Sequence, residues 1–373
     1  AYWFMKKYIE FSRGEVMVEE IADKYKKIIL NEVEKLSLPK EHPFLAYPNT
    51  PESRNLDIYI FLNMMMGEQC DIPKKLLQKC NGLDNGKYSH LKFLEGLDEA
   101  LILYYILIVN LENVSSVIYE PSEIMKNNKT LEYSCVFERP IRCLVNIEVK
   151  TMRCDPFVKE DNLNIRSVSD GSILIKRLIN DDAEYDTLLR KHPEAIELKS
   201  STYYSAFKQN IKRIIGKYEG GKNIQCPMLN IGFICIHFST SMEEFYTYMF
   251  HEEKGIYKNL DWGNLDALVL FLVDARNDVI LQNVYEMGYV VTMLKTDTLI
   301  NRKFMEIMRL DNYILQGNEV NDDIHEVAQK GAKLFKVLKR EGFLNILPFE
   351  ATEEDIKNYL EYLKSEKIRY DKN

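Results

Sequence analysis

The sequence predicts an α/β protein with a mixed sheet, because helices and apolar strands alternate through its middle part. A long apolar helix at residues 89–111 is followed by three short strand-like segments, and a second helix at 201–218 is followed by two more. The five strand-like segments cover residues 114–120, 131–137, 144–150, 231–238 and 267–273. The last two are almost wholly apolar, which is typical of strands covered on both faces. Layers of helix on sheet follow from this order.

Composition supports a folded chain with an acidic surface. Of 373 residues 46% are hydrophobic, which is ample for a core and excludes general disorder. The net charge of −8 argues against nonspecific adhesion to nucleic acid over the whole surface, although a local basic stripe could still bind it. The longest nearly unbroken apolar run, residues 100–111, is shorter than the roughly 20 residues of a membrane span, so no membrane contact is expected.

Three parts are expected along the chain. Residues 1–88 form a helical N-terminal region, and residues 89–295 form the α/β core with a polar insertion at about 153–198. Residues 296–373 form a helical C-terminal region. The helices are predicted from apolar residues at a spacing near 3.6. Besides the core helices, they cover residues 15–36, 324–341 and 353–367, and Ser89 is expected to cap the first core helix.

The segment 144–150 aims polar side chains into one space. It alternates strictly between apolar and polar residues, so Asn146, Glu148 and Lys150 share one face of the strand. A five-residue loop joins this strand to segment 131–137, which predicts an antiparallel hairpin with opposed residue numbers that sum to 280. Glu132 then faces Glu148. Because opposed like charges destabilise a sheet, this pair calls for a neutralising group between them.

A divalent metal would neutralise that pair, with Lys150 beside it. Two carboxylates hold Mg²⁺ or Mn²⁺ through hard oxygen ligands and leave positions for water and a phosphate oxygen. Such a metal lowers the pKa of bound water and offsets charge that develops on phosphorus. A lysine steadies the attacking hydroxide or the same developing charge. The set Glu132, Glu148 and Lys150 therefore predicts a metal-dependent phosphodiesterase site.

The same residues resemble a known superfamily. The segments YEP at 119–121, LEY at 131–133 and IEVKT at 147–151, with the order of elements over residues 89–274, resemble the PD-(D/E)XK, or restriction-endonuclease-like, nucleases. The resemblance implies that Glu148 and Lys150 are the (D/E)XK pair and that Glu132 replaces the usual Asp, with Leu-Glu in place of Pro-Asp. It further implies that Glu99, on the preceding helix, or Glu120 completes the catalytic set.

The second core helix supplies candidate contacts to substrate. In an otherwise acidic chain, residues 199–222 carry six basic residues against one acid. Lys208, Gln209, Lys212 and Arg213 are expected to grip a phosphate backbone, and Gln209 to reach the metal site. The alternative is an ordinary solvated helix face.

The function expected is therefore a metal-dependent endonuclease that hydrolyses DNA, in host defence (antiviral restriction) or nucleic-acid processing. DNA is favoured over RNA as partner, and the flanking helices are expected to mediate homodimerisation or docking to a helicase or sensor subunit. Seven scattered Cys without a CxxC pair are typical of reduced thiols in a cytoplasmic protein. The alternative is a catalytically degenerate nuclease fold that binds nucleic acid or protein.

Overall fold

The structure is a computed structural model. It describes residues 15–49, 52–110, 113–121, 130–153, 174–177, 190, 196–199, 201–218, 227–237, 256–257, 259–273, 284–296, 298–308, 310, 313–315, 333–340 and 343–348. The predicted helix at 353–367 and most of the predicted insertion lie outside these residues. No helix among the described residues is long and apolar enough to cross a membrane.

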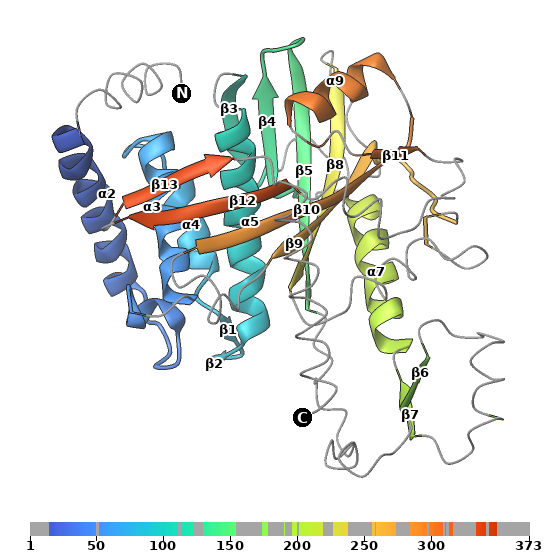
Figure 1. Cartoon of the computed structure of the whole chain (residues 1–373), viewed down its shortest axis with the longest axis horizontal. Helices are drawn as coiled ribbons and strands as arrows, with labels where there is room; N and C mark the ends of the chain where they lie inside the picture. The colour runs from blue at the N-terminus through green and yellow to red at the C-terminus, as the bar shows by residue number, and fades with distance from the viewer. Residues whose placement is uncertain are drawn as a thin grey trace.

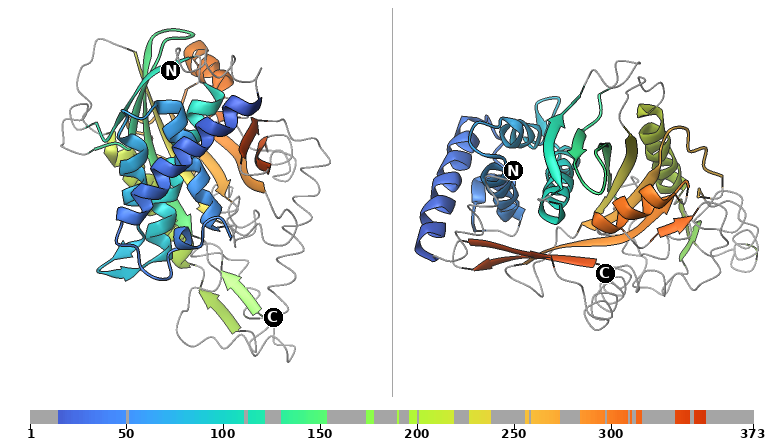
Figure 2. Two further views of the ribbon diagram at one scale, coloured as in Figure 1. Left: turned by 90° about the vertical axis from the view of Figure 1, so that its left-hand side faces the viewer. Right: turned by 90° about the horizontal axis from the view of Figure 1, so that it is seen from above.

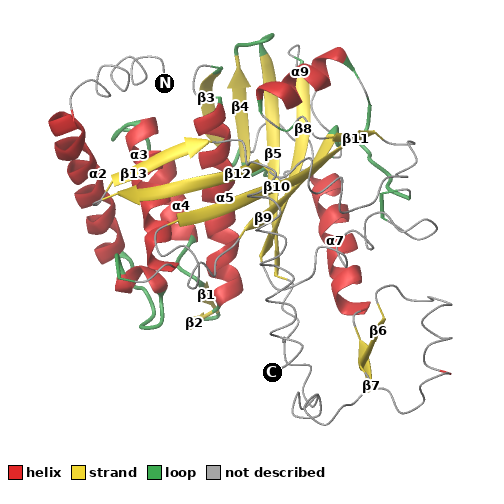
Figure 3. Ribbon diagram, viewed as in Figure 1, coloured by secondary structure: helices red, strands yellow, loops and turns green. Residues whose placement is uncertain are grey.

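A mixed sheet forms the centre of the described fold (Figures 1 and 3). Its strands lie in the order β13-β12-β10-β9-β8-β5-β4-β3, and β11 pairs with β10 outside this path. Their bounds are β3 Val114–Tyr119, β4 Tyr133–Phe137, β5 Cys143–Arg153, β8 Met228–His237, β9 Ala267–Val273, β10 Val284–Leu294, β11 Tyr313–Leu315, β12 Lys333–Arg340 and β13 Phe343–Pro348. Strands β5, β8 and β9 pair in parallel, and β3, β4 and β5 pair antiparallel. The α/β class with a mixed sheet is confirmed.

Helices cover both faces of β5 and β8. Seen from above, α2, α3 and α5 lie on one side of these strands and α7 lies on the other (Figure 2, right). The helices are α2 Glu15–Lys35, α3 Leu56–Met66, α4 Ile72–Lys79, α5 His90–Val109, α7 Ser201–Lys217 and α9 Leu299–Ile307. The short elements are η1 Pro43–Ala46, η2 Glu52–Asn55, the pair β1 Leu83–Asp84 and β2 Lys87–Tyr88, and the pair β6 Leu174–Arg177 and β7 Ile196–Lys199.

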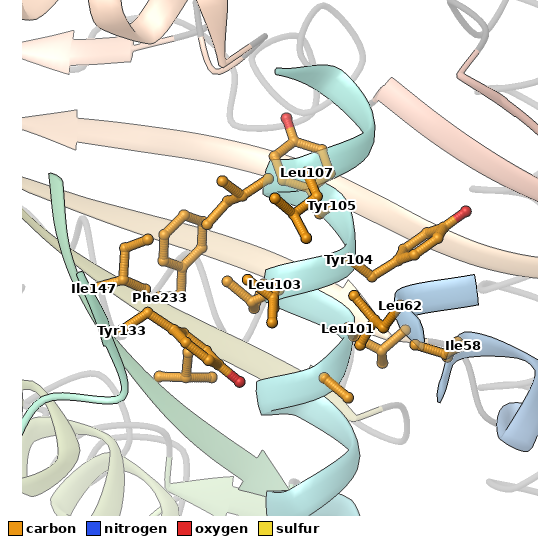
Figure 4. Close-up of a cluster of buried hydrophobic side chains, with 14 of the residues drawn as sticks. Ile58, Leu62, Leu101, Leu103, Tyr104, Tyr105, Leu107, Tyr133, Ile147 and Phe233 are labelled. Carbon is orange, nitrogen blue, oxygen red and sulfur yellow. The ribbon is translucent and has the colours of Figure 1, made fainter. Parts of the chain in front are cut away.

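Helix α5 lies in the middle of the apolar core. The predicted cap is confirmed, since the Ser89 hydroxyl accepts a hydrogen bond from the Lys92 N–H at 3.4 Å. Nearly every residue of α5 from Phe93 to Leu107 is buried, because the helix is covered on both sides. In Figure 4, Tyr133, Ile147 and Phe233 of the sheet lie on one side of α5, and Ile58 and Leu62 of α3 lie on the other. The second half of α5, residues 100–109, is apolar all round, which is typical of a buried helix.

Helix α7 packs on the opposite face and comes unusually close to β8. A Cβ atom added at Gly232 would lie 2.5 Å from Ile214 Cγ2 and 3.1 Å from Leu268 Cδ1. Gly232 pairs in parallel register with Glu148 of β5. The absence of a side chain at Gly232 therefore lets α7 approach the sheet directly beside Glu148.

Two expectations about secondary structure are wrong. The second half of the predicted helix at 324–341 is instead β12, which pairs with β10 and β13 and so adds the C-terminal region to the central sheet. Backbone pairing with β10 overrides the helical pattern of this short apolar-basic segment. The insertion expected to be irregular contains β6 and β7, which pair with each other in parallel. The division at residues 88 and 295 stays a prediction.

Candidate active site

Strand β5 carries two of the predicted site residues into the space under α7. Glu148 is fully buried at 0% exposure, and its Oε1 atom lies 2.5 Å from the Nζ atom of Lys150, whose side chain is 22% exposed. Asn146, on the same face, is also buried and donates to Asn230 Oδ1 at 2.9 Å. The two charged side chains therefore share one face of the strand, as the alternation predicts.

The hairpin register is confirmed over the whole of β4. Tyr133 pairs with Ile147 and Phe137 pairs with Cys143, so the opposed residue numbers sum to 280. Glu132 directly precedes the first of these pairs, and its Oε1 atom lies 3.8 Å from Lys150 Nζ. Lys150 therefore contacts both carboxylates that the register predicts to be opposed. In the structure an ammonium group supplies the neutralising charge that their proximity requires.

A lysine that the sequence did not single out gathers the remaining carboxylates. The Nζ atom of Lys79, at the end of α4, lies 2.8 Å from Glu99 Oε2, 3.0 Å from Glu132 Oε2 and 3.4 Å from Glu120 Oε1. Glu120 has a left-handed backbone with φ of 47°, and its N–H donates to the Glu132 carbonyl at 3.0 Å. Backbone conformations of this kind collect at functional sites. Glu99 and Glu120, the two candidates for completing the catalytic set, are therefore each linked to Glu132 through Lys79.

Helix α7 contributes a third lysine, Lys217. Its Nζ atom donates to the Thr130 carbonyl at 2.6 Å and lies 3.5 Å from Glu148 Oε1. The sequence count of basic residues on this helix includes Lys217, but the choice of contacts to substrate omitted it. The helical spacing of Ile211, Ile214 and Tyr218 marks the buried stripe of α7 in the sequence. Lys217 lies at the edge of that stripe, so its placement next to the sheet could have been inferred.

The four residues chosen from α7 do not reach the carboxylates. Lys208, Gln209, Lys212 and Arg213 are all exposed, and Phe207, Ile211, Ile214 and Tyr218 form the buried stripe. Helical geometry places Gln209 about 180° from that stripe. Among the described residues no hydrogen bond or ion pair joins Gln209 to Glu132 or Glu148. The four side chains form an outward-facing polar surface on α7 that carries three basic groups, and their contact with a substrate stays a prediction.

Burial shifts the proton affinity of two carboxyl groups. Desolvation raises the pKa of Glu148, and the nearby charge of Glu132 raises it further against the opposing effect of Lys150. Desolvation, with the charge of Glu132, raises the pKa of Glu99 to about 8, although Lys79 opposes the shift. Carboxylates that are deprived of water in this way take up a cation or a proton. Both groups therefore favour a bound positive charge.

A divalent cation fits Glu132 and Glu148 by donor chemistry. Glu148 Oε2 is buried and receives no hydrogen bond from the described residues, so an unfilled acceptor lies at the centre of the site. Carboxylate oxygen is the donor that Mg²⁺ and Mn²⁺ prefer. In their present positions, the described side chains form no group of three or more His, Cys, Asp or Glu able to hold a metal. Only Glu132 and Glu148 would therefore hold the cation, and oxygens of water and substrate would fill its other coordination positions.

Comparison with known proteins assigns no family. No protein-family model matches the chain, and no curated protein matches it. Among solved structures, the crystal structure of the central domain of yeast acetyl-CoA carboxylase matches with a TM-score of 0.26 and 9% sequence identity, over 68% of this chain. The chain spans 27% of the length of that structure's chain. A TM-score of this size does not demonstrate a shared fold and says nothing of what the chain does.

Proposed function

We propose that the chain is a metal-dependent nuclease that hydrolyses phosphodiester bonds in DNA and has a restriction-endonuclease-like core. The observation that carries the proposal is the convergence of Glu132, Glu148 and Lys150 beside the first residue of β4, at the end of the hairpin away from its loop. In the central sheet and its two helices, the order from α5 to β8 is helix, three strands, helix, strand, which supports the proposal further; β6 and β7 form a separate pair between β5 and α7. Host defence or restriction is the role proposed for such an activity.

Each of the three residues has a proposed task. Glu132 and Glu148 would hold Mg²⁺ or Mn²⁺, which supplies a water of lowered pKa and offsets charge on the phosphorus. Lys150 Nζ would steady the attacking hydroxide, whose oxygen forms the new bond to phosphorus. The bond between phosphorus and the leaving oxygen breaks, and that oxygen keeps the electron pair and takes up a proton from solvent. Solvent also accepts the proton that the attacking water gives up. Lys217 of α7 lies 3.5 Å from Glu148 and orients that carboxylate.

The buried position of Glu148 suits this chemistry. Electrostatic stabilisation is stronger in a site from which water is excluded, and the groups that supply it do not have to reorganise during the reaction. Lys150 and Lys217 are each only about one quarter exposed, at 22% and 25%, so they keep contact with solvent and can meet a phosphate. The exposed basic residues of α7 lie on the same helix as Lys217 and would contact the flanking backbone.

The test is cleavage of linear, circular and single-stranded DNA in Mg²⁺ or Mn²⁺, with RNA as a further substrate. We expect metal-dependent cutting of DNA that EDTA stops and that Lys150→Ala and Glu148→Gln each reduce at least 100-fold. Lys92→Ala is the matched control, because Lys92 also forms an ion pair, with Glu95, but on the exposed start of α5. Equal cutting by the wild type and Lys150→Ala would refute the assignment.

A second function is favoured by one feature, the neutralisation of the carboxylates by lysines. A degenerate nuclease fold that binds nucleic acid or protein would use these ion pairs for stability alone, and the replacement of Pro-Asp by Leu-Glu agrees with it. Mn²⁺ binding separates the two functions. A catalytic site binds Mn²⁺ in the wild type and loses it in Glu148→Gln, whereas a degenerate site binds none.

A further inference from the structure

Lys79 contacts three carboxylates that come from three different elements. Its Nζ atom lies within 3.4 Å of Glu99 on α5, Glu120 after β3 and Glu132 before β4. The side chains of Glu99 and Glu132 are only 7% and 11% exposed, so these charges are largely removed from water. Buried carboxylates in such a group require a cation. Lys79 meets that requirement from within the chain.

The fold fixes the position of Lys79 through a close approach of two helices. A Cβ atom added at Gly96 of α5 would lie 2.7 Å from the Cα atom of Cys80, the residue that follows Lys79. Glu99 lies three residues after Gly96, on the same side of α5. Because Gly96 lets the end of α4 rest on α5, the stem of Lys79 begins beside Glu99. The lysine is therefore held by packing as well as by its ion pairs.

The charges of the cluster limit how many metal ions it can accept. Glu99 is protonated near neutral pH, so Glu120, Glu132 and Glu148 carry three negative charges, and Lys79, Lys150 and Lys217 carry three positive charges. These charges cancel, and a bound phosphodiester adds one negative charge. A single divalent ion then leaves an excess of one positive charge. Two divalent ions would leave an excess of three positive charges in a largely buried site, which is unfavourable.

We propose that the Lys79 ammonium group occupies the position of a second cation, so that the site binds one divalent ion, at Glu132 and Glu148. The unfilled oxygen Oε2 of Glu148 marks where that ion is accepted. The inference rests on the proposed function for the first ion. It concerns the number of metal ions that the chain binds in the absence of substrate. Removal of Lys79 frees the Glu99, Glu120 and Glu132 carboxylates for an additional ion.

The test is the number of Mn²⁺ ions bound per chain, measured by titration calorimetry and by electron paramagnetic resonance of free Mn²⁺. We expect one ion in the wild type and two in Lys79→Met, which keeps most of the side-chain volume but removes the charge. Lys79→Arg keeps the charge and should bind one. Lys74→Met is the matched control, because Lys74 lies on the same helix but faces Glu32 at 3.7 Å.

Lys79→Met leaves buried carboxylates without their counter-ion and can unfold, so a second measurement uses the melting temperature. Mn²⁺ should raise the melting temperature of Lys79→Met by several degrees more than that of the wild type, because ligands stabilise the state that binds them. An equal rise in both proteins overturns the inference. So does a count of two ions in the wild type, or a count in folded Lys79→Met that is no higher than that of the wild type.

The inference and the proposed function fail in different ways. The difference in ion count between Lys79→Met and the wild type tests the role of Lys79. The ion count of the wild type, and its loss in Glu148→Gln, test the metal site of the proposed nuclease. A wild type that binds no Mn²⁺ while Lys79→Met binds one would refute the nuclease site and support the role of Lys79.

Discussion

Gly232 sets the distance between α7 and the sheet, and its substitution gives the sharpest test of that packing. In Gly232→Ala the new methyl group would lie 2.5 Å from Ile214 Cγ2, where ordinary contacts are 3.4–4 Å. Helix α7 must therefore move outward by about 1 Å, or Ile214 must leave its rotamer. Overpacking of this kind costs about 1–3 kcal/mol of unfolding free energy. The same shift lengthens the contact of Lys217 with Glu148.

A double-mutant cycle measured by urea denaturation isolates this contact. Ile214→Ala alone costs about 2–5 kcal/mol, because it leaves a cavity in a fully buried position. In the double variant the alanine at 232 enters part of that cavity, so the two costs should fall short of additivity by at least about 1 kcal/mol. Ile211 is buried on the same helix but is not among the nearest neighbours of the added methyl, so Gly232→Ala with Ile211→Ala should be additive. Additivity in both pairs would refute the reasoning.

Three further predictions concern other buried polar groups. Burial lowers the pKa of His42, whose Nε2–H donates to the Cys80 carbonyl. The unfolded chain therefore takes up a proton at His42 below about pH 6.5, where the folded chain does not. Below that pH the unfolding free energy of the wild type should fall relative to that of His42→Gln, by up to about 1.4 kcal/mol per pH unit. A pH-independent difference would contradict this. Glu99 keeps its proton in the folded state up to about pH 8 but loses it near 4.5 when unfolded, so the wild type should lose stability relative to Glu99→Gln as the pH rises between these values and no further above 8. A constant or rising difference would rule this out. Tyr105→Phe removes the 2.6 Å hydrogen bond to the Met308 carbonyl and should lower the unfolding free energy by about 1–3 kcal/mol, and a change below 0.5 kcal/mol would show that water replaces it.

The sequence predicts those parts of the site that depend on local geometry. The alternation of β5 fixes the shared face of Glu148 and Lys150, and the five-residue loop fixes the register that places Glu132 next to them. Both follow from the period of a strand and the length of a hairpin. The core elements from α5 to β9 are found within a few residues of their predicted ends for the same reason.

Features that depend on distant packing could not be predicted. Lys79 reaches Glu132 from 53 residues upstream, and nothing in its own helix marks it apart from Lys74 and Lys75. The segment Lys333–Arg340 has apolar residues at a helical spacing but lies in the sheet, because β10 offers it a free edge. Local propensity is overridden wherever a partner far along the chain supplies the backbone hydrogen bonds.

The central place of α5 has a consequence for how the chain is made. The half of this helix that follows Glu99 is apolar on every side, yet Phe271, which packs on Tyr105 at 4.9 Å, is synthesised some 165 residues later. At typical ribosome speeds that interval lasts about 10–30 s, during which the sheet-facing side of the helix has no partner from β9. Exposed apolar surface on that timescale favours aggregation. A chaperone that holds the nascent chain until β9 emerges would therefore increase the yield of folded protein.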